Sequence, residues 1–202
     1  GVMEPVAAKP EREIAVIVRT LRAIAPDILC VQEIGPADSL DDLRTRLRTV
    51  GLDYPYWEQV EGPDEERRIA LLARASIVER HSLSHIRFDL GGTIERVRRG
   101  ILDVVIEITP AYRLRVIVLH LKSRRAAPGG EALVRRHEAQ IVRRHMDRIL
   151  LAQPTVNLLV MGDLNDTKDQ PVIQEIAGVA GSRTHMADLP LADESGDRWT
   201  LY

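Results

Sequence analysis

The chain has 202 residues, a length that favours one domain and allows at most two small ones. Hydrophobic residues make up 45% and charged residues 29%, a composition that excludes an intrinsically disordered chain. Lys and Arg total 28 against 30 Asp and Glu, and this near-neutral balance excludes a histone-like general nucleic-acid binder.

Three further classes of protein are disfavoured by residue content. No apolar run is long enough for a transmembrane helix, so we expect no membrane span, and a cytoplasmic location is favoured. The single cysteine, Cys30, cannot form an internal disulfide or a zinc cluster and is expected to be a small buried hydrophobe on its strand. Aromatic residues make up only 3% of the chain, too few for the stacking platform on which a single-stranded nucleic-acid binder depends.

The apolar pattern predicts a mixture of helices and short strands. In chain order these are a helix at 11–25, a buried strand at 28–31, a helix at 38–50, β-rich runs at 68–74, 76–88, 99–109 and 113–121, a helix at 130–152, a strand at 157–161 and a short helix after Pro171. Segments 53–66 and 87–99 are interpreted as loops, 182–198 as a polar loop, and 199–202 as the beginning of a strand. The arginines of the 130–152 helix are interpreted as a solvated face: Arg135, Arg136, Arg143, Arg144 and Arg148.

Three polar groups each follow the end of an apolar strand. Glu33 follows 28–31, His120 follows 116–119, and Asp163 follows 158–161 with Asn165 two residues on. A strand end fixes the position of a side chain while the following loop leaves it accessible. The three groups supply a ligand for a hard cation, a donor that can carry positive charge, and a carboxylate–amide pair that can orient water.

Each of these groups also has a structural interpretation. Glu33 alone could be a turn or helix-capping residue, and His120 alone could be a buried histidine with satisfied hydrogen bonds. Asp163 could accept the hydrogen bond of an Asx turn with Asn165. The occurrence of all three types at strand ends favours the chemical interpretation.

Basic residues near the histidine are open to two interpretations. Lys122, Arg124 and Arg125 could bind a substrate phosphate or only solvate a turn, and we take Lys122 and Arg124 as candidate substrate-binding residues. Arg99 precedes a predicted strand and is interpreted as structural.

Three segments carry a resemblance to the endonuclease/exonuclease/phosphatase family, which includes the DNase-I-like nucleases. The family's first acidic motif is similar to Pro26-Asp27-Ile28-Leu29-Cys30-Val31-Gln32-Glu33. Its histidine motif is similar to Val118-Leu119-His120-Leu121-Lys122-Ser123, and its Gly-Asp-x-Asn motif is similar to Met161-Gly162-Asp163-Leu164-Asn165-Asp166. Residues 69–74 look like the strand between the first two motifs. Each motif alone is weak, whereas the three in this order are a strong signal that covers residues 11–202.

The resemblance implies an α+β fold and a chemistry. The fold is a four-layered α/β/β/α sandwich, two mixed β-sheets packed face to face and flanked by helices, here one domain over residues 1–202. The chemistry is cleavage of phosphoester bonds with Mg²⁺ or Mn²⁺. Matched position by position, Glu33 would be a metal ligand, Asp163 would orient or deprotonate the attacking water, Asn165 would hold the phosphate or that water, and His120 would hydrogen-bond the phosphoryl oxygens. Such a set suits in-line phosphoryl chemistry.

Two parts of the family pattern are absent from this sequence. No strand ending in an Asn precedes the 11–25 helix, and the chain stops at Trp199-Thr200-Leu201-Tyr202, before the family's last strands and its Ser-Asp-His segment. We therefore expect a fragment, incomplete at both ends, in preference to a shortened relative. The 202-residue chain by itself is then expected to have little activity.

The resemblance thus predicts a divalent-metal-dependent phosphoesterase that cleaves a phosphodiester or phosphomonoester. Its substrate stays open among DNA, RNA, a phospholipid head group and a small phosphate ester, with a nuclease preferred, and its oligomeric state stays open as well. The alternative is a non-catalytic binding protein that retains the scaffold. The missing Asn and Asp-His pair favour this alternative, and the retained set of Glu33, His120, Asp163 and Asn165 argues against it. The gene-encoded sequence on both sides would discriminate between them.

Overall fold

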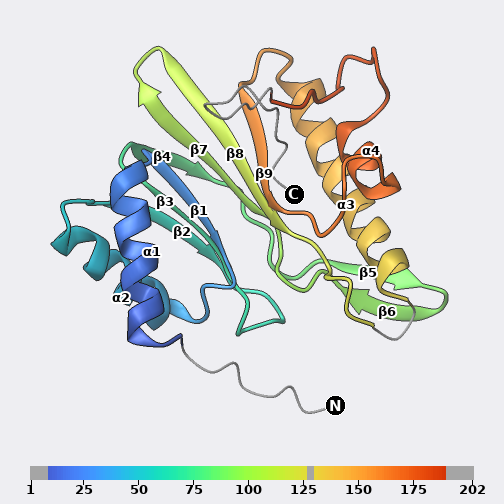
Figure 1. Cartoon of the computed structure of the whole chain (residues 1–202). Coiled ribbons are helices and arrows are strands. Elements are labelled where there is room, and N and C mark those ends of the chain that lie inside the picture. The colour runs from blue at the N-terminus through green and yellow to red at the C-terminus, as the bar shows by residue number, and fades with distance from the viewer. Residues whose placement is uncertain (1–8, 127–129, 190–202) are drawn as a thin grey trace. The chain divides into compact units, whose positions relative to one another are not determined.

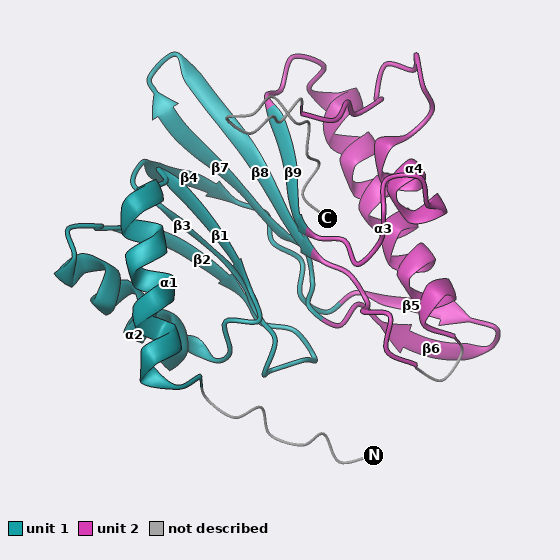
Figure 2. Ribbon diagram, viewed as in Figure 1, with its two compact units in different colours: residues 1–85, 99–119, 158–162 teal, residues 86–98, 120–157, 163–202 magenta. Residues whose placement is uncertain are grey.

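The computed structural model describes residues 9–126 and 130–189. The strand expected to begin at 199–202 and the end of the polar loop expected at 182–198 lie outside the described residues. The chain divides into two compact units (Figure 2). Unit 1 comprises Gly1–His85, Arg99–Leu119 and Leu158–Gly162, and unit 2 comprises Ile86–Arg98, His120–Asn157 and Asp163–Tyr202.

Most of the predicted elements are present at the predicted places (Figure 1). They are α1 (Glu11–Ile24), β1 (Ile28–Gln32), α2 (Ala37–Thr49), β3 (Ile69–Ala73), β4 (Ser76–Arg80), β7 (Leu102–Thr109), β8 (Tyr112–His120), α3 (Glu131–Ala152), β9 (Leu158–Asp163) and α4 (Pro171–Ala177). The described part of the predicted polar loop, 182–189, contains neither helix nor strand.

Three strands were not predicted. β2 (Tyr56–Val60), β5 (Arg87–Leu90) and β6 (Thr93–Arg96) fall in segments interpreted as loops, and the predicted run 76–88 ends as β4 at Arg80. β2 lacks an alternating apolar pattern because it lies at the edge of its sheet, with the first two residues exposed. Its partner strand β3 and the Arg44 guanidinium, 3.4 Å from the ring centre of Trp57, hold it in place. Tertiary pairing therefore decides this strand.

Unit 1 is built in layers around β3. In the three-stranded sheet β1–β3–β2, both outer strands run antiparallel to β3. α1 and α2 cover one face of this sheet (Figure 1), and the core between them contains Val18, Leu40, Leu47, Leu52, Tyr54, Ala70 and Leu72. The other face of β3 packs against β7 and β8 through Ile69, Leu71, Ala73, Leu102, Val104, Ile106, Val116 and Val118. Burial on both faces explains why every residue of β3 is apolar.

The second sheet of unit 1 has the strand order β4–β7–β8–β9. β4, β7 and β8 are successive antiparallel neighbours. Two sheets packed face to face, with helices on the outer face of the first, confirm the predicted α+β sandwich. The remaining helices, α3 and α4, belong to unit 2.

Cys30 on β1 packs against the core between the two sheets. Burial raises the pKa of its thiol to about 12, so the thiol is neutral at physiological pH. Since only the thiolate is a strong nucleophile, Cys30 serves as the small hydrophobe that the sequence predicts.

A buried ion pair lies on the other face of the β7–β8 ladder. Asp103 is fully buried, and the Nε and Nη2 atoms of Arg115 donate to its two carboxylate oxygens at 2.8 and 2.7 Å. The strand alternation that turns Val104 and Val116 into the core turns Asp103 and Arg115 away from it. The pair therefore satisfies two charges that have little access to water.

We expect Asp103→Ala to lower the free energy of unfolding by about 3–5 kcal/mol, because it leaves the Arg115 guanidinium buried without its carboxylate. The control is Glu107→Ala on the same strand, which breaks the more exposed 2.9 Å pair with Arg113 and should cost at most about 1 kcal/mol. Chemical denaturation of both variants measures the difference. Equal losses for the two variants would contradict a special role for the buried pair.

Unit 2 contains α3, α4 and the β5–β6 hairpin. Arg143 on α3 donates from Nη1 to the Ile176 carbonyl of α4 at 2.7 Å, and the ring of Phe88 in β5 meets that of His137 on α3 edge-on, at 5.7 Å between centroids. The interpretation of the α3 arginines as a solvated face is wrong for Arg135 and Arg143, which are buried. In the part of the chain that the structure describes, no helix combines the length and the apolar character that crossing a membrane requires.

Candidate active site

Two neighbouring strands bring their carboxyl ends together. β8 ends at His120 and β9 ends at Asp163, and the backbone N–H of Leu121 donates to the Asp163 carbonyl at 3.0 Å. Adjacent strands whose carboxyl ends lie side by side run in parallel. This arrangement places the histidine motif and the Gly-Asp-x-Asn motif at one edge of the sheet.

The glycine before Asp163 allows the two strands to approach this closely. Gly162 has a φ of +130°, and a Cβ built on it would lie 2.0 Å from the Leu119 carbonyl oxygen. No side chain fits at that distance, and only glycine adopts this backbone conformation without strain. The glycine of the motif is therefore required by the backbone geometry beside the site.

His120 and Asp163 face each other across the two strand ends. The His120 Nε2 atom lies 3.9 Å from Asp163 Oδ2. The histidine side chain is 2% exposed, whereas that of the aspartate is 46% exposed. The pair thus combines a buried ring with a carboxylate that water can reach, and it is an ion pair only when the histidine is protonated.

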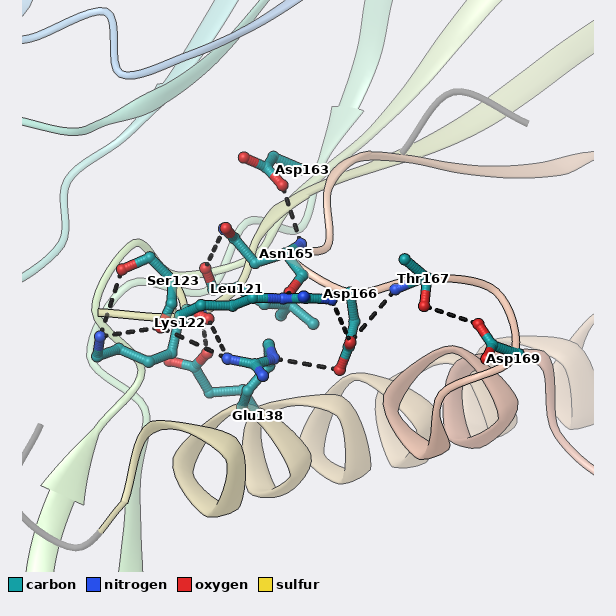
Figure 3. Close-up of polar contacts among 11 residues, drawn as sticks. Leu121, Lys122, Ser123, Glu138, Asp163, Asn165, Asp166, Thr167 and Asp169 are labelled. Atoms are coloured by element: carbon teal, nitrogen blue, oxygen red, sulfur yellow. Dashed lines mark hydrogen bonds and ion pairs between the residues drawn. The ribbon is translucent and has the colours of Figure 1, made fainter. Parts of the chain in front are cut away.

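Asn165 is held in a tight turn after the strand (Figure 3). Its backbone N–H donates to Asp163 Oδ1 at 2.9 Å, and its side-chain Nδ2 donates to the Leu121 carbonyl at 3.0 Å. The Asx turn considered as the structural alternative is therefore formed. It uses Oδ1 of Asp163, while Oδ2 is the oxygen that lies nearer His120. The turn and a chemical role are compatible, because they use different oxygens.

The two basic candidates after the histidine differ in their contacts. Lys122 donates from Nζ to the carbonyls of Ser123 and Arg125, at 3.1 and 2.8 Å, so its ammonium group closes the turn. Arg124 is 62% exposed and donates from Nε to the Asn165 carbonyl at 3.3 Å. The contacts of Lys122 fit the structural interpretation, whereas Arg124 presents an accessible guanidinium beside Asn165.

Helix α3 supplies two supporting residues that the sequence did not reveal. Glu138 is 1% exposed and its Oε2 accepts a 2.7 Å hydrogen bond from the Lys122 backbone N–H (Figure 3). Arg135 donates from Nη1 to the Lys122 carbonyl at 3.1 Å and from Nε to Asp166 Oδ2 at 3.3 Å. The i, i+3 spacing of these two charges was the available signal, since it puts them on one face of the helix. Together they hold the loop after β8 and the loop after β9.

Glu33 belongs to unit 1 and has its own surroundings. It follows β1 with a φ of 56°, its side chain is 59% exposed, and its Oε1 lies 4.0 Å from Nε of Arg67. Arg67 also pairs with the buried Asp64 at 3.5 Å, and Asp64 pairs in turn with Arg99 at 3.2 Å. Arg99 is thus buried within an ion-pair network, which agrees with its structural interpretation.

The structure therefore brings together five of the six candidate residues. His120, Lys122, Arg124, Asp163 and Asn165 lie in unit 2. The approach of Glu33 in unit 1 to these five stays a prediction. Among the described residues, no three His, Cys, Asp or Glu side chains converge as a ready-made metal cluster.

Comparison with known proteins gives one family. The model of the "Endonuclease/Exonuclease/phosphatase family" matches residues 6–200. No curated protein sequence matches this chain significantly.

Solved structures share the fold at low sequence identity. The catalytic domain of human nocturnin, solved with a bound sulfate anion, is 19% identical with a TM-score of 0.65, and the match covers 85% of this chain and 63% of that one. Sphingomyelinase C from Streptomyces griseocarneus is 16% identical with a TM-score of 0.61, over 82% and 61% of the two chains. ANGEL2, a 2′,3′-cyclic phosphatase solved with adenosine-2′,3′-vanadate, is 15% identical with a TM-score of 0.56, over 80% and 46%. This chain therefore spans less than two thirds of the length of each, and the likeness shows the fold alone.

Proposed function

The chain belongs to the endonuclease/exonuclease/phosphatase family, and from this premise we propose that it is a divalent-metal-dependent phosphoesterase that hydrolyses its substrate by in-line attack of water. The observation that carries the proposal is the convergence of His120, Asp163 and Asn165 at two adjacent strand ends. The Asx turn uses Oδ1 of Asp163, and Nδ2 of Asn165 holds the Leu121 carbonyl, but neither contact requires a histidine opposite Oδ2 of Asp163. A phosphoryl-transfer site does require a base, a donor and a group that positions the phosphate.

We propose a chemical role for each of the three residues, with which its contacts are compatible. The accessible Asp163 carboxylate orients the attacking water and accepts its proton as the new P–O bond forms. His120 donates to a phosphoryl oxygen as negative charge develops, and its burial strengthens that interaction. The amide of Asn165, held on the Leu121 carbonyl, fixes the phosphate or the water. The P–O bond to the leaving group breaks, and the leaving oxygen takes a proton from solvent.

A divalent cation fits the donor chemistry of Glu33. Mg²⁺ is typically held by one or two carboxylates, with waters and substrate phosphate completing its shell, so a single exposed carboxylate suits Mg²⁺ or Mn²⁺ better than it suits a structural zinc. We therefore assign Glu33 as the residue that holds the cation. When bound, the cation would neutralise charge on the phosphoryl oxygens.

The substrate is a phosphate ester, and we prefer a nucleic acid. The related folds include a sphingomyelinase and a 2′,3′-cyclic phosphatase, so the fold by itself does not choose the substrate. Arg124, an exposed guanidinium beside Asn165, favours a substrate with a phosphate near the site, because guanidinium groups bind phosphate in a bidentate manner.

We expect a chelator to abolish turnover of bis(p-nitrophenyl) phosphate by the full-length protein, and Mg²⁺ or Mn²⁺ to restore it. Glu33→Gln should raise the Mg²⁺ concentration that gives half-maximal rate about tenfold or more, because it removes the charged ligand. Mg²⁺ binding without substrate, measured by calorimetry, should weaken in parallel. The control is Glu61→Gln, which changes an exposed glutamate of the same unit that pairs with Arg68.

Three results would count against this proposal. Full activity in the presence of chelator would refute the metal requirement. An equal effect of Glu33→Gln and Glu61→Gln would refute the role of Glu33. Binding of phosphate esters without any turnover would favour the non-catalytic alternative.

A further inference from the structure

A groove lies in unit 2 beside the candidate active site. Its volume is about 610 Å³, and it lies between the first turns of α3 and the segment that leads into α4. The residues that line it are Arg124, Glu131, Ala132, Leu133, Arg135, Arg136, Asp166, Thr167, Gln170, Pro171 and Val172. We call it the α3–α4 groove.

The groove has an excess of positive charge, and one of its cations is uncommitted. Arg124 and Arg135 both donate to Asp166, at 3.1 and 3.3 Å, so the negative charge of Asp166 is shared by two guanidinium groups. Arg136 is exposed and has no hydrogen bond or ion pair to any residue within 9–126 and 130–189. The lining thus carries three positive charges, from Arg124, Arg135 and Arg136, and two negative charges, from Glu131 and Asp166. This excess of positive charge suits the binding of an anion.

The groove begins directly beside the catalytic candidates. Asp166, which lines it, follows Asn165 in sequence, and consecutive Cα atoms are about 3.8 Å apart. Arg124 links the candidate active site to the groove, because its Nε donates to the Asn165 carbonyl and its Nη2 donates to Asp166. Figure 3 shows Asn165 and Asp166 next to each other in the loop after β9. A substrate held at Asn165 could thus extend into the groove without leaving the protein surface.

We propose that the α3–α4 groove binds a second phosphate of the substrate, next to the scissile one, with Arg136 as its principal contact. This inference rests on the proposed function and deepens it, because it names the substrate class. A polynucleotide strand carries a phosphate at every nucleotide, whereas a phosphocholine lipid or a simple phosphomonoester carries one phosphate in total. A guanidinium that offers several donors in one plane is suited to a phosphate oxygen pair.

The first test measures binding without turnover. A fluorescein-labelled single-stranded oligonucleotide is titrated with the full-length protein in chelator, and anisotropy is followed at several salt concentrations. Arg136→Gln should raise the dissociation constant about tenfold, because a charge-assisted hydrogen bond is lost. It should also lower the log–log salt slope by about 0.7, the value for one phosphate contact on a single strand.

The matched control is Arg148→Gln. Arg148 is an exposed arginine on the same helix that does not line the groove, so its replacement makes the same change in net charge. It should leave the dissociation constant and the salt slope within about twofold of wild type. Melting temperatures of both variants check that each folds. Equal effects of the two substitutions would overturn the groove as the binding site.

The second test compares two substrates in Mg²⁺. One is a dinucleoside monophosphate, with a single phosphate, and the other is the same dinucleotide with an added terminal phosphate. Wild type should show a higher kcat/KM for the second substrate, and Arg136→Gln should lose this preference while it keeps its rate on the first. Hydrolysis of both at equal kcat/KM by wild type and variant would overturn the inference and leave the proposed function standing. Hydrolysis of neither dinucleotide, with bis(p-nitrophenyl) phosphate still turned over, would overturn the inference and leave the proposed function standing. Absence of turnover on all three substrates would instead overturn the proposed function, together with the inference that rests on it.

Discussion

Asp163→Asn should lower kcat of the full-length protein on bis(p-nitrophenyl) phosphate by about 10²–10⁴-fold, the usual contribution of a positioned general base. The replacement keeps Oδ1 as an acceptor for the Asn165 N–H, so the Asx turn should survive. It replaces Oδ2, the carboxylate oxygen nearer His120, by an amide nitrogen, which cannot accept a proton from water. Because the side chain is nearly half exposed, little packing is lost, and the melting temperature should stay close to that of wild type.

The control for this variant is Asp169→Asn. Asp169 is exposed in the same loop, and the hydrogen bond from the Thr167 hydroxyl lowers the pKa of its carboxyl group, so it is ionised at neutral pH. Its replacement removes one carboxylate near the site without touching the assigned base, and kcat should change less than about twofold. Unchanged turnover in Asp163→Asn, or an equal loss in both variants, would refute the role given to Asp163.

Gly162→Ala should be among the most destabilising single substitutions in the chain. The added methyl group would lie 2.0 Å from the Leu119 carbonyl oxygen, which is backbone and cannot rotate away, so the two strands must separate. We expect the free energy of unfolding to fall by about 3 kcal/mol or more, a large part of the stability of an ordinary domain. Activity should fall with it, because separation of the strands moves Asp163 away from His120.

The control for Gly162→Ala is Gly51→Ala, which introduces backbone strain without a steric clash. Gly51 also has a positive φ, +87°, yet a Cβ there would meet no atom within 4 Å. Its replacement should therefore cost only the strain of a left-handed residue, about 1–2 kcal/mol, and should leave activity intact. Denaturant unfolding of both variants gives the comparison. A loss for Gly162→Ala no larger than that for Gly51→Ala would show that the strands can accommodate a side chain.

Local sequence patterns were sufficient for the elements that bury a continuous or periodic apolar surface. β3 is apolar throughout because it has core on both faces, and the long helix α3 follows from its apolar periodicity. The strand-end positions of His120 and Asp163 follow from the same reasoning, since each is the first polar group after an apolar run. The family resemblance then supplied their expected roles, which sequence spacing alone does not determine.

The tertiary structure decided the features that depend on partners distant in sequence. The edge strand β2 exists because β3 pairs with it, and Asp103 tolerates full burial because Arg115 lies diagonally across the ladder. Arg135 and Glu138 have the composition of a solvated helix face, yet the loops after β8 and β9 bring backbone and carboxylate groups to them. A charged side chain in a sequence carries no record of whether a counter-charge will reach it. Only the fold supplies that partner, and with it the difference between a solvent-exposed charge and a buried support of the site.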